Sequence, residues 1–129
     1  RQMCIRDRCE IVPEREFYDY EAKYVLDTTR IELPAQLSTE QTEEVRRLAI
    51  AAVRALDCEG MARVDFLMET ATGAFYVNEV NTLPGFTSIS MYPKMWEHAG
   101  VPYAQLLNEL IQLALARHAR RQATSYQRL

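Results

Sequence analysis

The sequence predicts an α+β fold in which an antiparallel sheet is packed by helices. Two strand-like runs, "MARVDFLM" (61–68) and "AFYVNEV" (74–80), flank the polar segment "ETATG" (69–73), as in a β-hairpin. Apolar residues recur with helical spacing in two further stretches, 40–57 and 102–117. The length of 129 residues is typical of one domain or of part of one.

The first predicted helix begins after Ser38. The segment "STEQ" combines a capping hydroxyl with Gln41 three residues later, which is a capping-box pattern. One face of the helix is apolar at Val45, Leu48, Ala49, Ala52, Val53 and Leu56. We therefore expect a helix that packs against the sheet and takes no part in chemistry.

The segment after the hairpin reads as a long loop, a short helical turn and a second helix. Residues 82–93 are rich in small and hydroxyl side chains, and Gly100 closes the turn that follows. Pro102 is a favourable first-turn residue for the next helix. Its apolar stripe is Tyr103, Leu106, Leu107, Leu110, Ile111 and Ala114. This helix is expected to back the sheet as well, and the basic tail from Arg117 is expected to fray.

Composition and charge exclude several functions. The formal net charge of −3 argues against a broad nucleic-acid surface. No apolar run approaches the roughly 18 residues of a membrane span, so no membrane association is expected. The three cysteines Cys4, Cys9 and Cys58 lack metal-type spacing, and we interpret them as free thiols in a reducing cytosol.

The first eight residues, "RQMCIRDR" (1–8), differ from the rest of the chain. They are highly charged, have no periodic pattern, and resemble the translation of a sequencing adapter. We therefore expect a non-native leader at residues 1–8, and a native but frayed terminus is the alternative.

The predicted hairpin gathers polar side chains on one face. A turn centred on Thr72 places Asp65 opposite Glu79 and Arg63 opposite Asn81. Two carboxylates, a carboxamide oxygen and a guanidinium then converge, and a slip of one residue would separate them.

Such a set predicts a metal and phosphate site. Magnesium prefers oxygen ligands and keeps waters or substrate phosphates as its other ligands. Asp65, Glu79 and Asn81 supply such oxygens, while Arg63 could stabilise an anion beside them. The simpler interpretation is a surface ion pair between Arg63 and Asp65, with Asn81 as an ordinary turn residue.

Several segments together resemble the C-terminal part of D-alanine–D-alanine ligase, a family of ATP-grasp enzymes in peptidoglycan synthesis. They are "FYDYEAKY", "ARVDFLM", "YVNEVNTLPGFTSISMYPKMWEHAG" and "YAQLLNELIQLA", and the resemblance runs from about Glu10 to Ala116. Its most specific part is Glu-x-Asn, followed by a Pro-Gly turn and a run of Ser and Thr. The resemblance implies the C-terminal half of an ATP-grasp domain over residues 9–129.

The resemblance also implies roles at the hairpin. Asp65, Glu79 and Asn81 would bind two Mg²⁺ ions, with Mn²⁺ as an alternative metal, and Glu79 would bridge the two ions. ATP would phosphorylate the carboxylate of a first D-alanine, and the amine of a second would attack the acyl phosphate. Arg63 and the backbone N–H of Gly85 would stabilise the resulting tetrahedral intermediate.

The metal-binding hairpin comprises residues 61–81, and the resemblance implies further roles outside it. Ser90 and the backbone of Met91, in the substrate loop 82–93, would hold the carboxylate of the second D-alanine. Lys23 and Tyr24 would lie on a lid loop at residues 14–30 that closes over the site and excludes water. This Lys-Tyr pair favours D-alanine as the second substrate.

The resemblance implies a cytoplasmic enzyme of cell-wall synthesis that is a homodimer at full length. The glycine-rich phosphate loop and most of the ATP clamp of the family have no counterpart in this sequence. We therefore expect the chain to be a fragment without ligase activity of its own. Two alternatives stay open: another ATP-grasp carboxylate–amine ligase, and a non-catalytic binding domain whose acidic cluster is structural.

Overall fold

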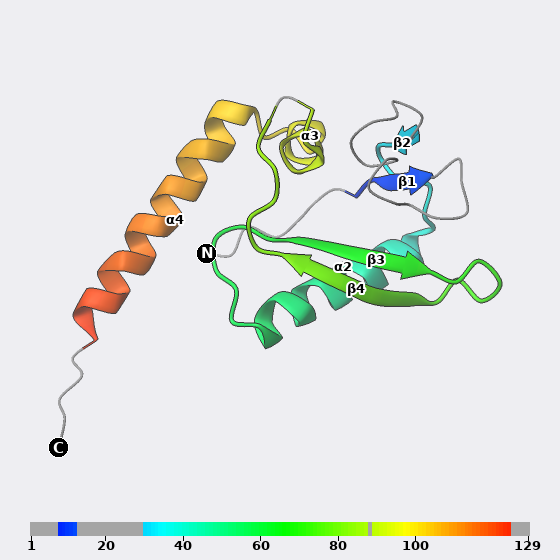
Figure 1. Ribbon diagram of the computed structural model, residues 1–129, viewed down its shortest axis with the longest axis horizontal. Coiled ribbons are helices and arrows are strands. Elements are labelled where there is room, and N and C mark those ends of the chain that lie inside the picture. Colours follow the sequence, from blue (N-terminus) through cyan, green and yellow to red (C-terminus); the bar gives the residue numbers. More distant parts are fainter. Residues whose placement is uncertain (1–7, 13–29, 88, 125–129) are drawn as a thin grey trace, which may run out of the picture.

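The computed structural model describes residues 8–12, 30–87 and 89–124, and it confirms the α+β prediction (Figure 1). The described part contains two separate two-stranded antiparallel sheets and three helices. The elements in order are β1 Glu10–Val12, β2 Arg30–Glu32, α2 Thr39–Ala55, β3 Arg63–Met68, β4 Phe75–Asn81, α3 Met91–His98 and α4 Tyr103–Ala123. The expected leader and lid loop lie outside the described residues, apart from Arg8 and Arg30.

Helix α2 begins with the expected capping box. The Ser38 hydroxyl accepts a hydrogen bond from the Gln41 N–H, and the Gln41 side chain accepts one from the Ser38 N–H. These bonds satisfy backbone donors that a helix start otherwise leaves unpaired. The helix ends at Ala55, two residues before the predicted end at 57, because Asp57 adopts a left-handed conformation with φ of 51°. Helix α2 packs against β3 and β4 as predicted (Figure 1).

Helix α4 differs from the prediction in two ways. It packs against α3 and lies apart from the β3–β4 sheet, so the expectation that it backs the sheet was wrong (Figure 1). It also continues to Ala123, past the predicted end at 117. Glu59, in the loop after α2, pairs with Arg120 at 2.7 Å and with Arg117 at 3.5 Å. These ion pairs hold the last turns, where basic residues also favour the helix dipole.

Helix α3 begins earlier than the sequence suggested. We predicted a loop through residue 93, whereas the helix starts at Met91 and includes Pro93. A proline is tolerated in the first turn because the N–H groups there have no partner within the helix. Ser90 therefore occupies the N-cap position of α3.

The densest packing in the described residues lies between α3 and α4. Tyr92 and Trp96 of α3 are buried there, and Leu106 of α4 is fully buried between them. Phe86, Met61, Val101 and Leu110 pack around this cluster. Burial raises the pKa of the Tyr92 hydroxyl. This cluster joins the loop after β4 to both helices, and it therefore positions the loop.

The Leu106→Ala variant should lower the free energy of unfolding by about 2–5 kcal/mol, because it leaves a cavity in this cluster. Trp96 is the only tryptophan of the chain, so its fluorescence during urea denaturation reports on the same cluster. Leu115→Ala, at an exposed position of α4, is the matched control and should change the stability by less than about 0.5 kcal/mol. Equal effects of the two changes would show that α4 does not pack in this way.

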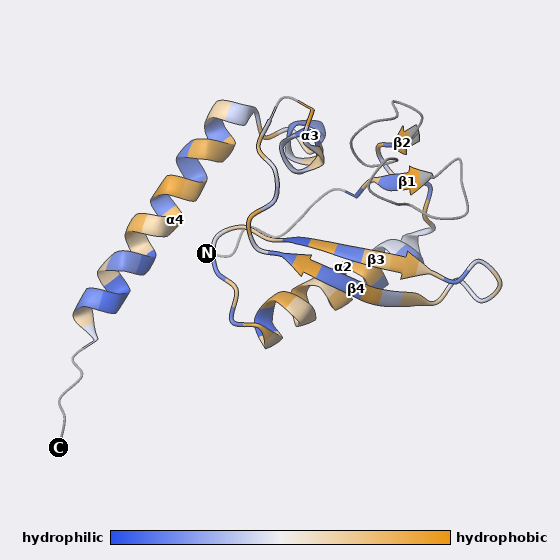
Figure 2. Cartoon of the chain, in the orientation of Figure 1, coloured by the Kyte–Doolittle hydropathy of each residue, from blue (hydrophilic) through white to orange (hydrophobic). Residues whose placement is uncertain are grey.

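Much of the apolar surface of α4 faces outward. Figure 2 shows hydrophobic residues recurring along the helix, and Leu107, Ile111 and Leu115 are exposed. Within the described residues, no helix is both long enough and apolar enough to cross a membrane.

Candidate active site on the hairpin

The register of the hairpin is the one that the sequence predicts at the site. Arg63 pairs with Asn81, and Asp65 pairs with Glu79. Because paired residues of an antiparallel ladder point to the same face, all four side chains lie together. The hairpin thus brings together the three predicted metal ligands and the predicted oxyanion-binding arginine.

A bulge separates this site from the rest of the hairpin. The register shifts by one residue between Asp65 and Phe66, and Phe66 pairs with Val77. Val77 therefore lies on the face opposite Glu79, although regular alternation along a strand would put both residues on the same face. At this point β4 contains one residue more than β3. Such a bulge lets the side chains on each side of it keep their own face of the sheet.

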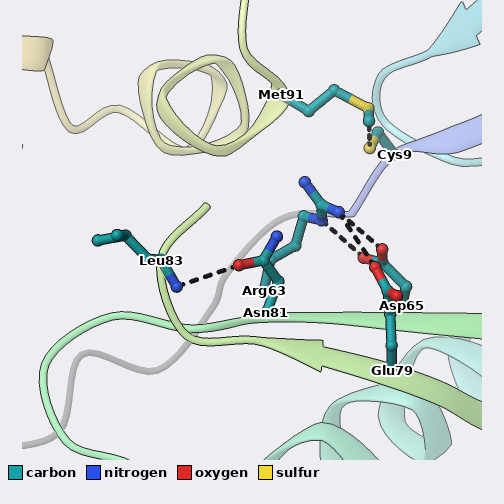
Figure 3. Close-up of polar contacts among 7 residues, drawn as sticks. All are labelled: Cys9, Arg63, Asp65, Glu79, Asn81, Leu83 and Met91. Atoms are coloured by element: carbon teal, nitrogen blue, oxygen red, sulfur yellow. Dashed lines mark hydrogen bonds and ion pairs between the residues drawn. The ribbon is translucent and has the colours of Figure 1, made fainter. Parts of the chain in front are cut away.

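Arg63 binds both oxygens of Asp65. Its Nε–H donates to Asp65 Oδ1 at 2.7 Å and its NH2 group donates to Oδ2 at 2.8 Å (Figure 3). The same guanidinium lies 3.7 Å from the Glu79 carboxylate. The hydrogen bonds that Arg63 donates to Asp65, together with the charges of Asp65 and Glu79, raise the pKa of Arg63 despite its partial burial. The ion pair of the simpler interpretation therefore exists, but it also includes Glu79.

Asn81 ends β4 and begins the turn into the next loop. Its Oδ1 accepts a hydrogen bond from the Leu83 N–H at 3.0 Å (Figure 3). A side-chain oxygen that bonds the backbone two residues on is an Asx turn. Asn81 thus directs the chain toward Pro84 and Gly85, and it keeps its carboxamide beside Arg63.

The donor set suits magnesium by its chemistry. Two carboxylates and one carboxamide oxygen on one face are hard oxygen ligands, and waters and phosphates complete such sites. Among the described residues, no three His, Cys, Asp or Glu side chains are grouped to hold a metal ion. The hairpin set has only two such members, Asp65 and Glu79, and Asn81 is the third donor. A metal ion held here would compete with Arg63 for the oxygens of Asp65.

The loop after Asn81 passes close to Ser90. A Cβ atom on Gly85 would lie 2.9 Å from Ser90 Oγ, so only glycine fits at this approach without displacing the serine. Ser90 Oγ accepts a hydrogen bond from the Thr87 N–H at 2.9 Å and lies 2.8 Å from Thr87 Oγ1. The structure therefore places two predicted site residues, Gly85 and Ser90, side by side.

Met91 follows Ser90 and contacts Cys9. The Cys9 thiol donates to Met91 Sδ at 3.5 Å, and Figure 3 shows this contact near Arg63. Sequence reasoning had treated Cys9 only as a free thiol, because nothing in the sequence links two residues that are 82 positions apart. Lys23 and Tyr24, the predicted lid residues, lie outside the described residues.

Comparisons with known proteins place the chain in a family. The family model described as "D-ala D-ala ligase C-terminus" matches residues 2–112. A D-alanine–D-alanine ligase of Solibacter usitatus is 60% identical over 120 residues, which are 93% of this chain and 37% of that protein. A relative of the same name from Thermoanaerobacter pseudethanolicus is 61% identical over 110 residues, which are 84% of this chain and 31% of that protein.

Solved structures give the same result. The D-alanine–D-alanine ligase of Bacillus anthracis complexed with ATP is similar with a TM-score of 0.70 and 38% identity, over 90% of this chain and 37% of that chain. VanG, a D-Ala:D-Ser ligase of Enterococcus faecalis, is similar with a TM-score of 0.66 and 38% identity, over 81% and 30% of the two chains. Both structures are ligases, and their fold is the ATP-grasp fold.

The chain belongs to the D-alanine–D-alanine ligase family and corresponds to its C-terminal part. It spans about 37% of the length of the Solibacter relative and 29% of a relative from Acetivibrio thermocellus.

Proposed function

We propose that the whole protein joins two D-alanine molecules at the expense of ATP and that this chain carries the magnesium-binding part of the active site. One observation supports this most: Arg63, Asp65, Glu79 and Asn81 share one face of the hairpin, in the register that the chemistry requires. The product, D-alanyl-D-alanine, would serve peptidoglycan synthesis and so cell shape. A homodimer in the cytoplasm is the expected assembly.

Asp65, Glu79 and Asn81 would hold two Mg²⁺ ions, with Glu79 shared between them and Mn²⁺ as an alternative metal. The ions would neutralise phosphate charge during transfer to the carboxylate of the first D-alanine. Glu79 suits a shared position because its side chain is more exposed than that of Asp65 and so accessible to ligands. Arg63 holds Asp65 in place through both carboxylate oxygens, which would be the oxygens offered to a metal ion.

Arg63 and the N–H of Gly85 would stabilise the negative oxygen that develops when the second amine attacks the acyl phosphate. The position of Arg63 supports this role, because the guanidinium is partly buried and held beside the metal ligands. Ser90 and the backbone of Met91 would bind the carboxylate of the second D-alanine. The N-cap position of Ser90 supports this, since the N-terminus of a helix favours an anion. Lys23 and Tyr24 would close the site as a lid.

A chimaeric ligase tests the proposal. In this chimaera, residues 9–129 of the present chain replace the matching segment of the Solibacter relative. The relative supplies all other parts of the enzyme. We expect phosphate release that requires both ATP and D-alanine, with D-alanyl-D-alanine as the product. The isolated 129-residue chain should release no phosphate under the same conditions, because it spans only about 37% of the length of that relative. Activity of the isolated chain, or inactivity of the chimaera in a folded state, would contradict the proposal.

A second candidate differs only in the second substrate. VanG, a D-Ala:D-Ser ligase, is as identical to this chain as the Bacillus anthracis enzyme is. The chimaeric ligase should therefore be assayed with D-serine and D-lactate alongside D-alanine. A higher kcat/KM with D-serine than with D-alanine as second substrate would favour a D-Ala:D-Ser ligase over a D-alanine–D-alanine ligase.

A further inference from the structure

We propose that Tyr103 is a positioning residue for the second amino acid, acting through the loop that carries Gly85 and Ser90. This inference rests on the proposed function, in which Ser90 binds the carboxylate of that amino acid. Tyr103 is the first residue of α4 and lies seventeen positions beyond the loop residue that it contacts, Phe86.

The tyrosine contacts Phe86 in two ways. Its hydroxyl donates a hydrogen bond to the Phe86 carbonyl at 3.3 Å. Its ring packs against the Phe86 ring with 5.7 Å between the centroids, and the buried Tyr92 packs on Phe86 at 5.6 Å. Phe86 is thereby held between α3 and α4.

The peptide unit between Phe86 and Thr87 is bonded at both ends. Its carbonyl accepts from the Tyr103 hydroxyl, and its N–H donates to Ser90 Oγ at 2.9 Å. Rotation of this peptide unit would break both bonds. The Tyr103 hydroxyl therefore helps to fix the orientation of the Ser90 hydroxyl, although the two side chains belong to different helices.

Phe86 and the buried Pro84 are held by packing, whereas the outer edge of the loop is less covered. An apolar hollow of about 540 Å³ lies between the loop and α4. Its lining residues are Met61, Leu83, Pro84, Gly85, Phe86, Tyr103, Leu107 and Leu110. Leu83, at the loop's outer edge, is 77% exposed. Because the exposed side of the loop borders this hollow, a directional bond to the loop backbone should affect its orientation more than it would in a filled core.

The test measures KM and kcat of the chimaeric ligase with Tyr103→Phe, which keeps the ring and removes the hydroxyl. We expect the KM for the second D-alanine to rise about three- to tenfold, the range typical of one lost hydrogen bond. The KM for ATP should stay unchanged. Tyr103→Leu, which also removes the ring, should raise the same KM further, and Tyr76→Phe at an exposed position of β4 should change neither KM.

The double variant Ser90→Ala/Tyr103→Phe tests whether the tyrosine acts through the serine. If it does, Tyr103→Phe has no further effect on the KM for the second D-alanine once Ser90 is gone. Additive effects, or an unchanged KM in Tyr103→Phe, would overturn the inference. A parallel rise in the KM for ATP would also overturn it, because general loss of structure affects both substrates. Inactivity of the unsubstituted chimaera would refute the proposed function instead.

Discussion

Replacing Arg63 by glutamine should slow ligation by about 10²- to 10³-fold and, at the same time, tighten the binding of Mg²⁺. The rate loss is the size expected when one donor to a developing oxyanion is removed. The gain in metal affinity follows because Arg63 occupies both oxygens of Asp65 and lies 3.7 Å from Glu79. Two unit charges about 4 Å apart interact by about 1 kcal/mol even in bulk water, so we expect at least about fivefold tighter binding.

The measurement is a Mg²⁺ titration of the chimaeric ligase by calorimetry, with phosphate release measured on the same samples. Arg47→Gln is the matched control, because Arg47 makes the same two-bond contact with Glu44 on the exposed face of α2. That variant should change neither the rate nor the metal affinity, and surface pairs contribute little to stability. Weaker metal binding in Arg63→Gln would show that the arginine orders the carboxylates and does not compete for them.

Replacing Glu79 by glutamine should lower the ligation rate by about 10²- to 10⁴-fold, because a metal ion contributes several kcal/mol to charge stabilisation. It should also weaken Mg²⁺ binding. Glutamine has nearly the same shape, and the Glu79 side chain is 53% exposed, so the free energy of unfolding should change by less than about 0.5 kcal/mol. This separates a loss of metal binding from a loss of folding.

Calorimetric titration with Mg²⁺, in the presence of ATP, is the measurement for Glu79→Gln. Glu69→Gln is the control, since Glu69 lies at the turn of the same hairpin and its loss leaves the site's face intact. Asp65→Asn provides a second test, and it should also reduce stability because Arg63 loses its charged partner. If metal and nucleotide binding stay unchanged in both Glu79→Gln and Asp65→Asn, these residues do not hold the metal.

The site residues on the hairpin were predictable because local rules decide their positions. Side chains alternate along a strand, and the length of the turn sets the register, so Asp65 and Glu79 could be paired from the sequence. The bulge next to Asp65 was not predictable, since no glycine or other local signal in the two strands marks it. The pairing of Asp65 with Glu79 and of Arg63 with Asn81 was predicted correctly, because the register shift falls between these pairs and the far end of β3.

The start of α2 was also predictable, because the side chains of Ser38 and Gln41 each bond the other's backbone three residues away, which is a local contact. The direction of α4 was not. Its apolar stripe fits either the sheet or another helix, and burial of Leu106 against Tyr92 and Trp96 determined the outcome. The spacing of apolar residues shows which face of a helix is buried, but it does not show which neighbouring element covers that face.

The sequence by itself determined the fold class, the capped start of α2, the paired residues of the hairpin and, through its motifs, the family. These features depend on neighbours in the chain or on one short turn. Only the tertiary structure decided that Cys9 meets Met91 and that Tyr103 reaches Phe86. Such contacts depend on rotamers and on packing between distant segments, and no local pattern records either.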